Sequence, residues 1–211
     1  MKECAGLLHE DDFAQRLNVS PYLFVCKNGI LNLRATRKGA DGRDTFYVDF
    51  RDGRPDDMMT FQAGKNPADN MDPITYRRYD PNDPHQQELD EFFSKIFPNA
   101  DVKKYVLILL CSCLEGYNRE QCYWIWYGGG GNGKSKILDL MRHVFGDYQK
   151  SLSTAALTRK RPDSGAANPD IISIKNKRFI YMGEPDEREP LNTSRMKQLS
   201  GEDMVEALSL I

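Results

Sequence analysis

The sequence predicts an α/β fold preceded by a small hairpin-plus-helical unit. A short aromatic and β-branched run at residues 122–127 is followed by the glycine-rich run 128–133, and apolar residues at helical spacing then extend to Phe145. A second apolar run, residues 178–182, ends in glycine and acidic residues. Strand, glycine loop and helix in this order begin a parallel α/β unit. The preceding hairpin and helices are predicted from separate patterns.

The hairpin is predicted from Asn28-Gly29, a dipeptide that readily supplies the positive φ angles of a tight turn. Two apolar runs flank this dipeptide within residues 22–34, which read YLFVCKNGILNLR. Residues 45–50 are a further strand candidate. Residues 51–87 are rich in Gly, Pro, Asp and Asn, so we expect loop with short elements there.

Two helices are expected next. Asp83-Pro84 opens the first, and its apolar positions recur at the spacing of one buried face: Leu89, Phe92, Phe93, Ile96 and Phe97. Asp101 is expected to cap the second, residues 102–115, which is apolar nearly all round and ends at Gly116. Nothing in residues 1–118 indicates a catalytic constellation.

Composition excludes several classes of protein. The 211 residues include 29 Lys and Arg against 31 Asp and Glu, a formal net charge of −2, so no strongly basic balance indicates nucleic acid. The longest apolar run, Tyr105 to Leu114, is about half of what a membrane span needs and predicts a buried helix, with no membrane partner. Five cysteines form no CxxC pair, and we interpret them as reduced thiols of an intracellular protein.

The glycine-rich run and the residues after it are the candidate functional site of the sequence. Residues 128–135 match G-x-x-x-x-G-K-[ST], and the predicted phosphate site comprises Gly128, Gly129, Gly130, Gly131, Asn132, Gly133, Lys134, Ser135 and the following Lys136. Glycines let backbone N–H groups approach a phosphate, and the helix N-terminus adds partial positive charge. Lys134 can reach the β- and γ-phosphates of ATP, and the Ser135 hydroxyl can bind Mg²⁺. The alternative is a glycine linker before a helix.

Such a site also needs an acid at the end of a neighbouring strand, which holds Mg²⁺ through water and polarises the attacking water. Glu184 is the first candidate because it follows the apolar run Phe179–Met182, and Asp186 is the second. Asp139 and Asp147 are weaker candidates, since one lies inside the helix and the other beyond its end. The alternative for Glu184 is a solvated loop acid.

A family resemblance follows from the order of the segments. The sequence resembles the primase-helicases of large nucleocytoplasmic DNA viruses, the poxvirus-type replicative helicases of superfamily 3. It resembles phage and plasmid primase-helicases more distantly. The resemblance runs from about residue 20 to residue 208. The segments that carry it are YLFVCKNGILNLR, QCYWIWYGGGGNGKSKILDLM, VFGDY, LTRKRPDSGAANPDI, KRFIYMGEPDE and MKQLSGEDMV.

The resemblance implies an AAA+-like P-loop NTPase core at residues 119–211, incomplete at the C-terminus, after a collar or linker domain at residues 1–118. It implies a homo-hexameric ring that moves along single-stranded or forked DNA while hydrolysing ATP with Mg²⁺. The ring would act with other replication proteins at a viral replication site or in the host cytoplasm. On this resemblance Lys134 and Ser135 hold phosphates and Mg²⁺, and Glu184 is the acid of the second motif.

The resemblance also nominates residues near DNA. Lys197, Gly201 and Asp203 match a third element whose region approaches the channel of ring helicases, although Lys197 equally fits a surface cation. A basic cluster that could contact phosphates is formed by Arg159, Lys160 and Arg161, with a solvated loop as the alternative. Leu208 stands where the family usually has an arginine, which leaves the contact of that arginine in question.

Two other functions stay open at this stage. The family's sensor residue and intersubunit arginine would lie beyond Ile211, so the chain could be a non-catalytic fragment that binds nucleotide or DNA or oligomerises. A small-molecule kinase could use the same loop, with residues 159–161 as a lid. The aromatic residues Trp124, Trp126 and Tyr127 could stack on bases, but we expect them in the core.

Overall fold

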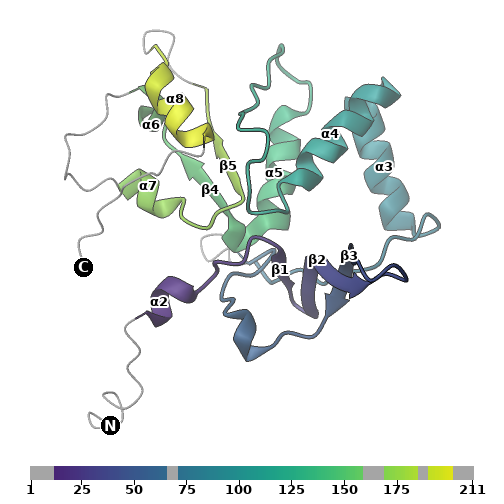
Figure 1. The fold of residues 1–211 in the computed structure, drawn as a ribbon. Coiled ribbons are helices and arrows are strands. Elements are labelled where there is room, and N and C mark those ends of the chain that lie inside the picture. The colour runs from purple at the N-terminus through teal and green to yellow at the C-terminus, as the bar shows by residue number, and fades with distance from the viewer. Residues whose placement is uncertain (1–11, 66–70, 159–168, 185–189, 202–211) are drawn as a thin grey trace.

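The computed structural model describes residues 12–65, 71–158, 169–184 and 190–201. Strands β1 (Leu23–Cys26), β2 (Gly29–Lys38) and β3 (Asp44–Arg51) form an antiparallel sheet, and β4 (Gln149–Leu152) pairs in parallel with β5 (Phe179–Met182) (Figure 1). The helices are α2 (Phe13–Arg16), α3 (Pro84–Ile96), α4 (Ala100–Ser112), α5 (Lys134–Phe145), α6 (Ala155–Thr158), α7 (Pro169–Ser173) and α8 (Thr193–Ser200). Single 3-10 turns are η1 (Pro55–Asp57) and η2 (Gly146–Tyr148). The predicted α/β class is confirmed.

The predicted hairpin forms, but its turn lies one residue earlier than expected. Cys26 pairs with Gly29, so Lys27 and Asn28 are the central residues of the turn. Gly29 is the first residue of β2 and has φ +152°. A Cβ at this position would lie 2.7 Å from the backbone oxygen of Arg51. The need for glycine therefore comes from the close approach of β3 as well as from φ.

Helix α3 begins as predicted. The Asp83 carboxylate accepts a hydrogen bond from the backbone N–H of His85, 2.9 Å away. On the predicted face Phe93 is buried and Phe92, Ile96 and Phe97 pack against the core. Leu89, in contrast, is 44% exposed, because the core ends before the first turns of this helix.

Helix α4 differs from the prediction in its cap and its burial. Asn99, not Asp101, caps it, because the Asn99 side chain accepts from the backbone N–H groups of Asp101 and Val102. Leu110 is buried, but Val102, Tyr105 and Ile108 are exposed, since the helix packs along one face only. Within the described residues no helix has the length and apolarity needed to cross a membrane.

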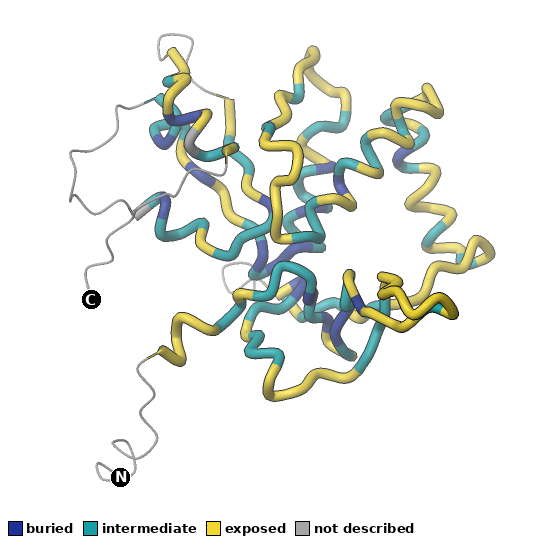
Figure 2. The backbone as a smooth tube through the Cα atoms, in the orientation of Figure 1, coloured by how far each residue is buried: buried dark blue, intermediate teal, exposed yellow. Residues whose placement is uncertain are grey.

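One hydrophobic core joins the hairpin, the helices and the glycine-loop helix. Its buried members include Phe24 and Leu31 of the sheet, Phe93 of α3, Leu110 of α4, Ile137, Met141 and Phe145 of α5, Tyr148 and Phe179. Figure 2 shows the buried segments gathered where these elements meet. Residues on both sides of position 118 therefore share one core, and the division into domains at that position stays a prediction.

The four residues after Val144, which we call the FGDY junction (residues 145–148), bind the N-terminal half through backbone hydrogen bonds. Asp147 donates its N–H to the carbonyl oxygen of Gln62 at 3.1 Å, and its carboxylate accepts the Gln62 N–H at 3.1 Å. Gly146 has φ +49°, and a Cβ there would lie 2.6 Å from the backbone nitrogen of Gly64. The junction thus has no room for a side chain at Gly146.

Tyr148 makes the second set of contacts at the junction. Its hydroxyl accepts from the Val25 N–H at 3.1 Å and donates to the Phe61 carbonyl oxygen at 3.2 Å. Burial raises the pKa of Tyr148 to about 12. The ring stacks on Phe24 with a centroid distance of 4.7 Å. The side chain therefore links the end of α5 to β1 and to the loop that follows β3.

Arg178, directly before β5, holds three separate segments together. Its guanidinium donates to the carbonyl oxygens of Leu114, Ser20 and Leu23. Desolvation lowers the pKa of this guanidinium. Because carbonyl oxygens are satisfied here by a charged donor, the contacts stabilise the packing of β5 against the hairpin and the end of α4.

The strand predicted before the glycine loop does not form. Residues 122–127 have no regular secondary structure and pair with none of the described strands. Trp124 and Tyr127 are exposed, Tyr127 at 97%, so the expectation that they lie in the core is wrong. Trp126 packs against the core as expected. Aromatic residues favour a strand only where a neighbouring strand pairs with it, and none of the described strands does so here.

Candidate nucleotide-binding site

The glycine loop at residues 128–133 leads directly into α5, whose first residue is Lys134. Gly128, Gly131 and Gly133 have φ values of +154°, +75° and +83°, which side-chain-bearing residues rarely adopt. A Cβ on Gly133 would lie 2.8 Å from Cδ1 of Ile96 in α3. The predicted need for glycine therefore has two causes, the backbone conformation of the loop and its contact with α3.

The Lys134 ammonium lies over the loop that precedes it. Nζ donates to the carbonyl oxygen of Gly128 at 2.8 Å, to that of Gly129 at 3.2 Å and to Oδ1 of Asn132 at 2.8 Å. All three acceptors belong to the glycine loop itself. The cation is thus held beside the first turn of α5 by oxygens that phosphate oxygens could replace.

The surroundings of the loop fit an anionic ligand. Nothing lies within 4 Å of a Cβ built on Gly129, Gly130 or Gly131. No side chain caps α5, so the N–H groups of its first turn have no side-chain acceptor there. Ser135, in that first turn, is exposed. An open loop, uncapped N–H groups and a lysine ammonium together make a site suited to phosphate.

Glu184 lies at the matching end of the parallel sheet. Helix α5 ends in η2, the chain reverses into β4, and β4 runs parallel to β5. The first turn of α5 and the carboxyl end of β5 therefore lie at the same end of this unit, as Figure 1 shows. Glu184 follows Met182 by two residues and is exposed. The role of Glu184 as an acid near a bound Mg²⁺ stays a prediction.

The two weaker acid candidates are occupied elsewhere. Asp139 pairs with Arg142 on α5 at 3.5 Å, and Asp147 holds the backbone of Gln62 at the FGDY junction. Neither belongs to the end of the sheet that carries Glu184. The ranking of the candidate acids stays a prediction. Asp186 lies outside the described residues.

The residues nominated for DNA are not assembled into one site by the described part of the chain. Lys197 lies in the last turn of α8 and is exposed, and α8 packs against α6. Gly201 caps α8, with its N–H donating to the Lys197 carbonyl oxygen at 2.8 Å. Arg159, Lys160, Arg161, Asp203 and Leu208 lie outside the described residues.

The described cysteines Cys26, Cys111, Cys113 and Cys122 are free thiols, as the sequence predicts. Burial raises the pKa of Cys26 and that of Cys113 to about 11. Both thiols are therefore protonated at neutral pH and are poor nucleophiles. Over the described ranges, no group of three or more His, Cys, Asp and Glu side chains could hold a metal ion.

Comparison with known proteins finds similar proteins in large DNA viruses. "Putative helicase L207/L206" of Acanthamoeba polyphaga mimivirus is 31% identical over 210 residues, which is 100% of this chain. "Putative helicase 022R" of Frog virus 3 and "Putative primase C962R" of African swine fever virus are each 24% identical, over 96% and 94% of this chain. The chain is a homologue of these viral proteins. The resemblance to helicases and primases of large DNA viruses is thereby confirmed.

The homology covers a limited part of those relatives. The chain spans 20% of the mimivirus protein, 25% of the Frog virus 3 protein and 19% of the African swine fever virus protein. No protein-family model matches the chain. The activity of the whole viral proteins therefore enters only as a proposal for this chain.

Proposed function

We propose that this chain is the nucleotide-binding part of a viral DNA helicase or primase-helicase, and that residues 128–135 bind ATP with Mg²⁺. The observation that carries the proposal is the position of Lys134, at the uncapped start of α5 and held by oxygens of the glycine loop. The relatives named as helicases and primases support a role in viral DNA replication. An AAA+-like core at residues 119–211 and a collar at residues 1–118 belong to this proposal.

Each residue of the proposed site would have its own chemical role. Backbone N–H groups at the start of α5 would bind phosphate oxygens, and Lys134 would neutralise the β- and γ-phosphates. The Ser135 hydroxyl would be a ligand of Mg²⁺, and Glu184 would hold a water for hydrolysis. Mg²⁺ supplies neutralisation of the charge that develops on the phosphates. Lys136 follows in the same turn and adds positive charge near the loop.

Translocation as a hexameric ring on single-stranded DNA is proposed for the longer protein. An arginine from a neighbouring subunit contributes a factor of about 10³–10⁵ in related phosphoryl-transfer enzymes. Turnover by a single subunit without a neighbour is therefore expected to be slow even where ATP binds well. Turnover stimulated by a small acceptor, with none stimulated by DNA, would favour the kinase alternative.

The test is calorimetric titration of ATP with Mg²⁺ into the chain and two variants. Lys134→Ala is expected to weaken binding by about tenfold or more, because a charge-assisted contact to phosphate is lost. Lys104→Ala removes an exposed lysine on α4 and is expected to leave affinity within about twofold. Equal ATP affinity in the parent chain and Lys134→Ala would refute the assigned site.

A further inference from the structure

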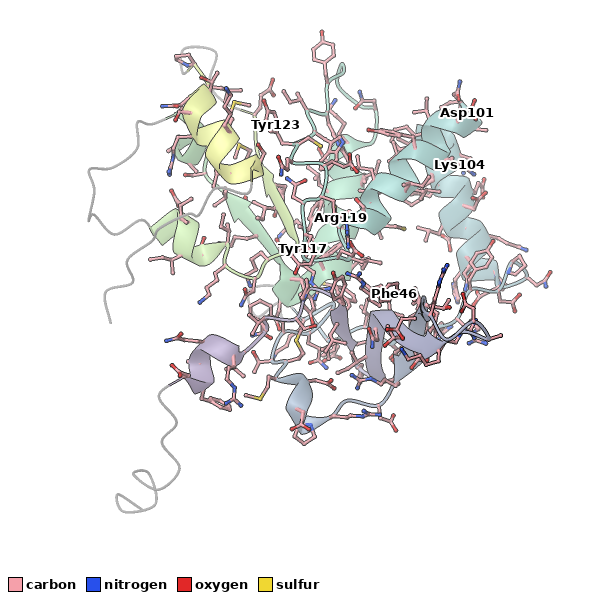
Figure 3. All side chains as sticks on the ribbon, viewed as in Figure 1. Phe46, Asp101, Lys104, Tyr117, Arg119 and Tyr123 are labelled. Carbon is pink, nitrogen blue, oxygen red and sulfur yellow. The ribbon has the colours of Figure 1, made fainter. Side chains whose placement is uncertain are left out.

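A row of exposed or half-buried aromatic rings and guanidinium groups lies on the hairpin side of the molecule. We call it the aromatic–arginine ladder, and its members in spatial order are Phe46, Arg34, Tyr22, Tyr117 and Arg119. They come from β3, β2, the residue before β1 and the link after α4. Figure 3 shows Phe46, Tyr117 and Arg119 along the side where the hairpin sheet faces α4.

The first half of the ladder centres on Arg34. Its Cζ lies 4.3 Å from the ring centroid of Phe46 and 5.1 Å from that of Tyr22. Its Nη1 donates to the Tyr22 hydroxyl at 2.6 Å. The Arg34 N–H donates to the side chain of Asn32, where the register of β2 against β3 shifts. Arg34 thus lies beside this irregularity, between the ring of Phe46 in β3 and the ring of Tyr22, which directly precedes β1.

The second half continues across Tyr22. The rings of Tyr22 and Tyr117 meet edge to face, with centroids 5.7 Å apart and planes at 61°. The Cζ of Arg119 lies 5.9 Å from the Tyr117 centroid, and Arg119 also pairs with Glu115 at 2.7 Å. Three rings and two cations thus form one continuous row, in which the rings of Tyr22 and Tyr117 are adjacent and one carboxylate lies beside the second cation.

The ladder does not belong to the hydrophobic core. Phe46 is 53% exposed and Tyr117 is 55% exposed, and Arg34 is also exposed. Arg34 forms no ion pair with any residue that the structure describes, and its guanidinium lies between rings instead. Large rings that the core does not need, held in place by cations, mark a surface that recognises a ligand.

The combination of exposed rings and guanidinium groups in one row indicates the chemical class of ligand. A nucleic acid strand presents a flat base and a phosphate in each nucleotide, so rings can stack on bases while guanidinium groups contact phosphates. Bases inside a duplex are already stacked on each other and leave no face for a protein ring. The charge and the rings together therefore match a single strand better than a duplex or an acidic peptide.

We propose that the aromatic–arginine ladder binds single-stranded DNA, with Phe46 and Tyr117 stacking on bases and Arg34 contacting the phosphate backbone. The choice of DNA rests on the proposed function, whereas the position of the surface rests on the ladder alone. The ladder contains none of the residues that the sequence nominated for DNA, which are Arg159, Lys160, Arg161 and Lys197. It gives the N-terminal half a direct role in holding the strand.

Strands β2 and β3 carry a second arginine–aromatic pair, which serves as a matched control. Arg37 and Tyr47 form a similar pair, with the Arg37 Cζ 5.4 Å from the Tyr47 centroid. Phe46 and Tyr47 are consecutive residues in a regularly paired part of β3, so their side chains point to opposite faces. Each ladder variant therefore has a partner of the same chemistry on the other face of the sheet.

The experiment measures fluorescence anisotropy of a labelled oligothymidylate of about 20 nucleotides, which exceeds the site size of a small domain. Arg34→Ala and Phe46→Ala are each expected to weaken binding by about fivefold or more, the loss of one stacked or phosphate contact. Arg37→Ala and Tyr47→Ala are expected to stay within about twofold of the parent chain. A blunt duplex of the same length should compete poorly.

Several results would overturn the proposal. The first is that the parent chain does not bind the oligothymidylate. The second is an equal loss of DNA affinity in the ladder and control variants. The third is a change in oligomeric state of the ladder variants while their DNA affinity is intact. Urea midpoints of all four variants would establish that each is folded. Calorimetric ATP binding by the ladder variants separates the two proposals, because it should persist whether or not the ladder binds DNA.

Discussion

The two ends of helix α5 differ in what surrounds them. At its C-terminal end Phe145 and Tyr148 are each 1% exposed, and the FGDY junction binds residues more than eighty positions away in the chain. Before its N-terminal end, ahead of the glycine loop, Tyr127 is 97% exposed, and the hydrogen bonds of Lys134 Nζ to described residues go to its own loop. One helix therefore has one end fixed by long-range packing and the other left open.

This difference indicates that the two motifs at the ends of α5, residues 128–135 and residues 145–148, have different roles. Residues 145–148 serve the fold, because their neighbours are buried protein groups from the hairpin and the loop after β3. Residues 128–135 have few such neighbours, so packing does not account for their side chains. We infer that a ligand accounts for them, which is the basis of the proposed nucleotide site.

The largest effect that the comparison predicts comes from deleting an aromatic ring at each end of α5. Phe145→Ala should reduce the free energy of unfolding by about 3–5 kcal/mol, because a fully buried ring leaves a cavity. Tyr127→Ala should change it by less than about 0.5 kcal/mol, since that ring is almost entirely in solvent. Urea unfolding of both variants measures the difference. Similar losses in the two variants would break the comparison.

A second effect concerns pH and Tyr148. Burial raises the pKa of Tyr148 to about 12 in the folded chain, above the ordinary value of 10.0. The folded state therefore keeps a proton that the unfolded state loses between these values. The resulting stability is fully present below about pH 10 and is lost as pH rises towards 12, by about 2–3 kcal/mol in total.

The variant Tyr148→Phe isolates this effect. It should lose about 1–2 kcal/mol at neutral pH, because the Val25 N–H and the Phe61 carbonyl oxygen lose their partner. Between pH 10 and 12 its stability should fall less steeply than that of the parent chain. The two proteins must be compared because the Cys26 thiol also has a raised pKa, so it contributes to the pH dependence of stability in both of them. Parallel slopes in the two proteins would mean that Tyr148 does not titrate as described.

The sequence predicted those elements whose pattern is local. Apolar spacing found α3 and α5, and the apolar run at residues 178–182 found β5. Strand β4 was missed because it reads Gln-Lys-Ser-Leu and buries only Leu152, so its assignment depends on pairing with β5. Residues 122–127 show the converse, since strong β propensity formed no strand in the absence of a pairing partner among the described residues.

The candidate site was predicted at the level of its motif, because glycine spacing and the helix that follows are both local. The cap of α4 was assigned two residues too late, since Asn99 and Asp101 are both good caps and only the structure separates them. The contact between Gly133 and Ile96 could not be predicted, because it joins residues of different helices through their packing. The same holds for the contacts of Arg178.

The smallest predicted effect is a difference in stability between two glycine variants of the loop before α5, and it tests whether α3 packs against this loop. Gly133→Ala should cost about 2 kcal/mol, because the φ of +83° strains an alanine and its Cβ would overlap Ile96. Gly131→Ala has a similar φ of +75° but open space around it, so it should cost only about 1 kcal/mol from backbone strain. Urea midpoints of the two variants give the difference.

A double-mutant cycle then assigns that difference to α3. Ile96→Ala removes the side-chain atoms that an alanine at position 133 would overlap. Gly133→Ala should therefore cost less in the Ile96→Ala background than in the parent chain, whereas the cost of Gly131→Ala should be the same in both. Equal costs of Gly133→Ala in the two backgrounds would show that backbone strain alone sets the requirement for glycine, and that α3 does not support the loop.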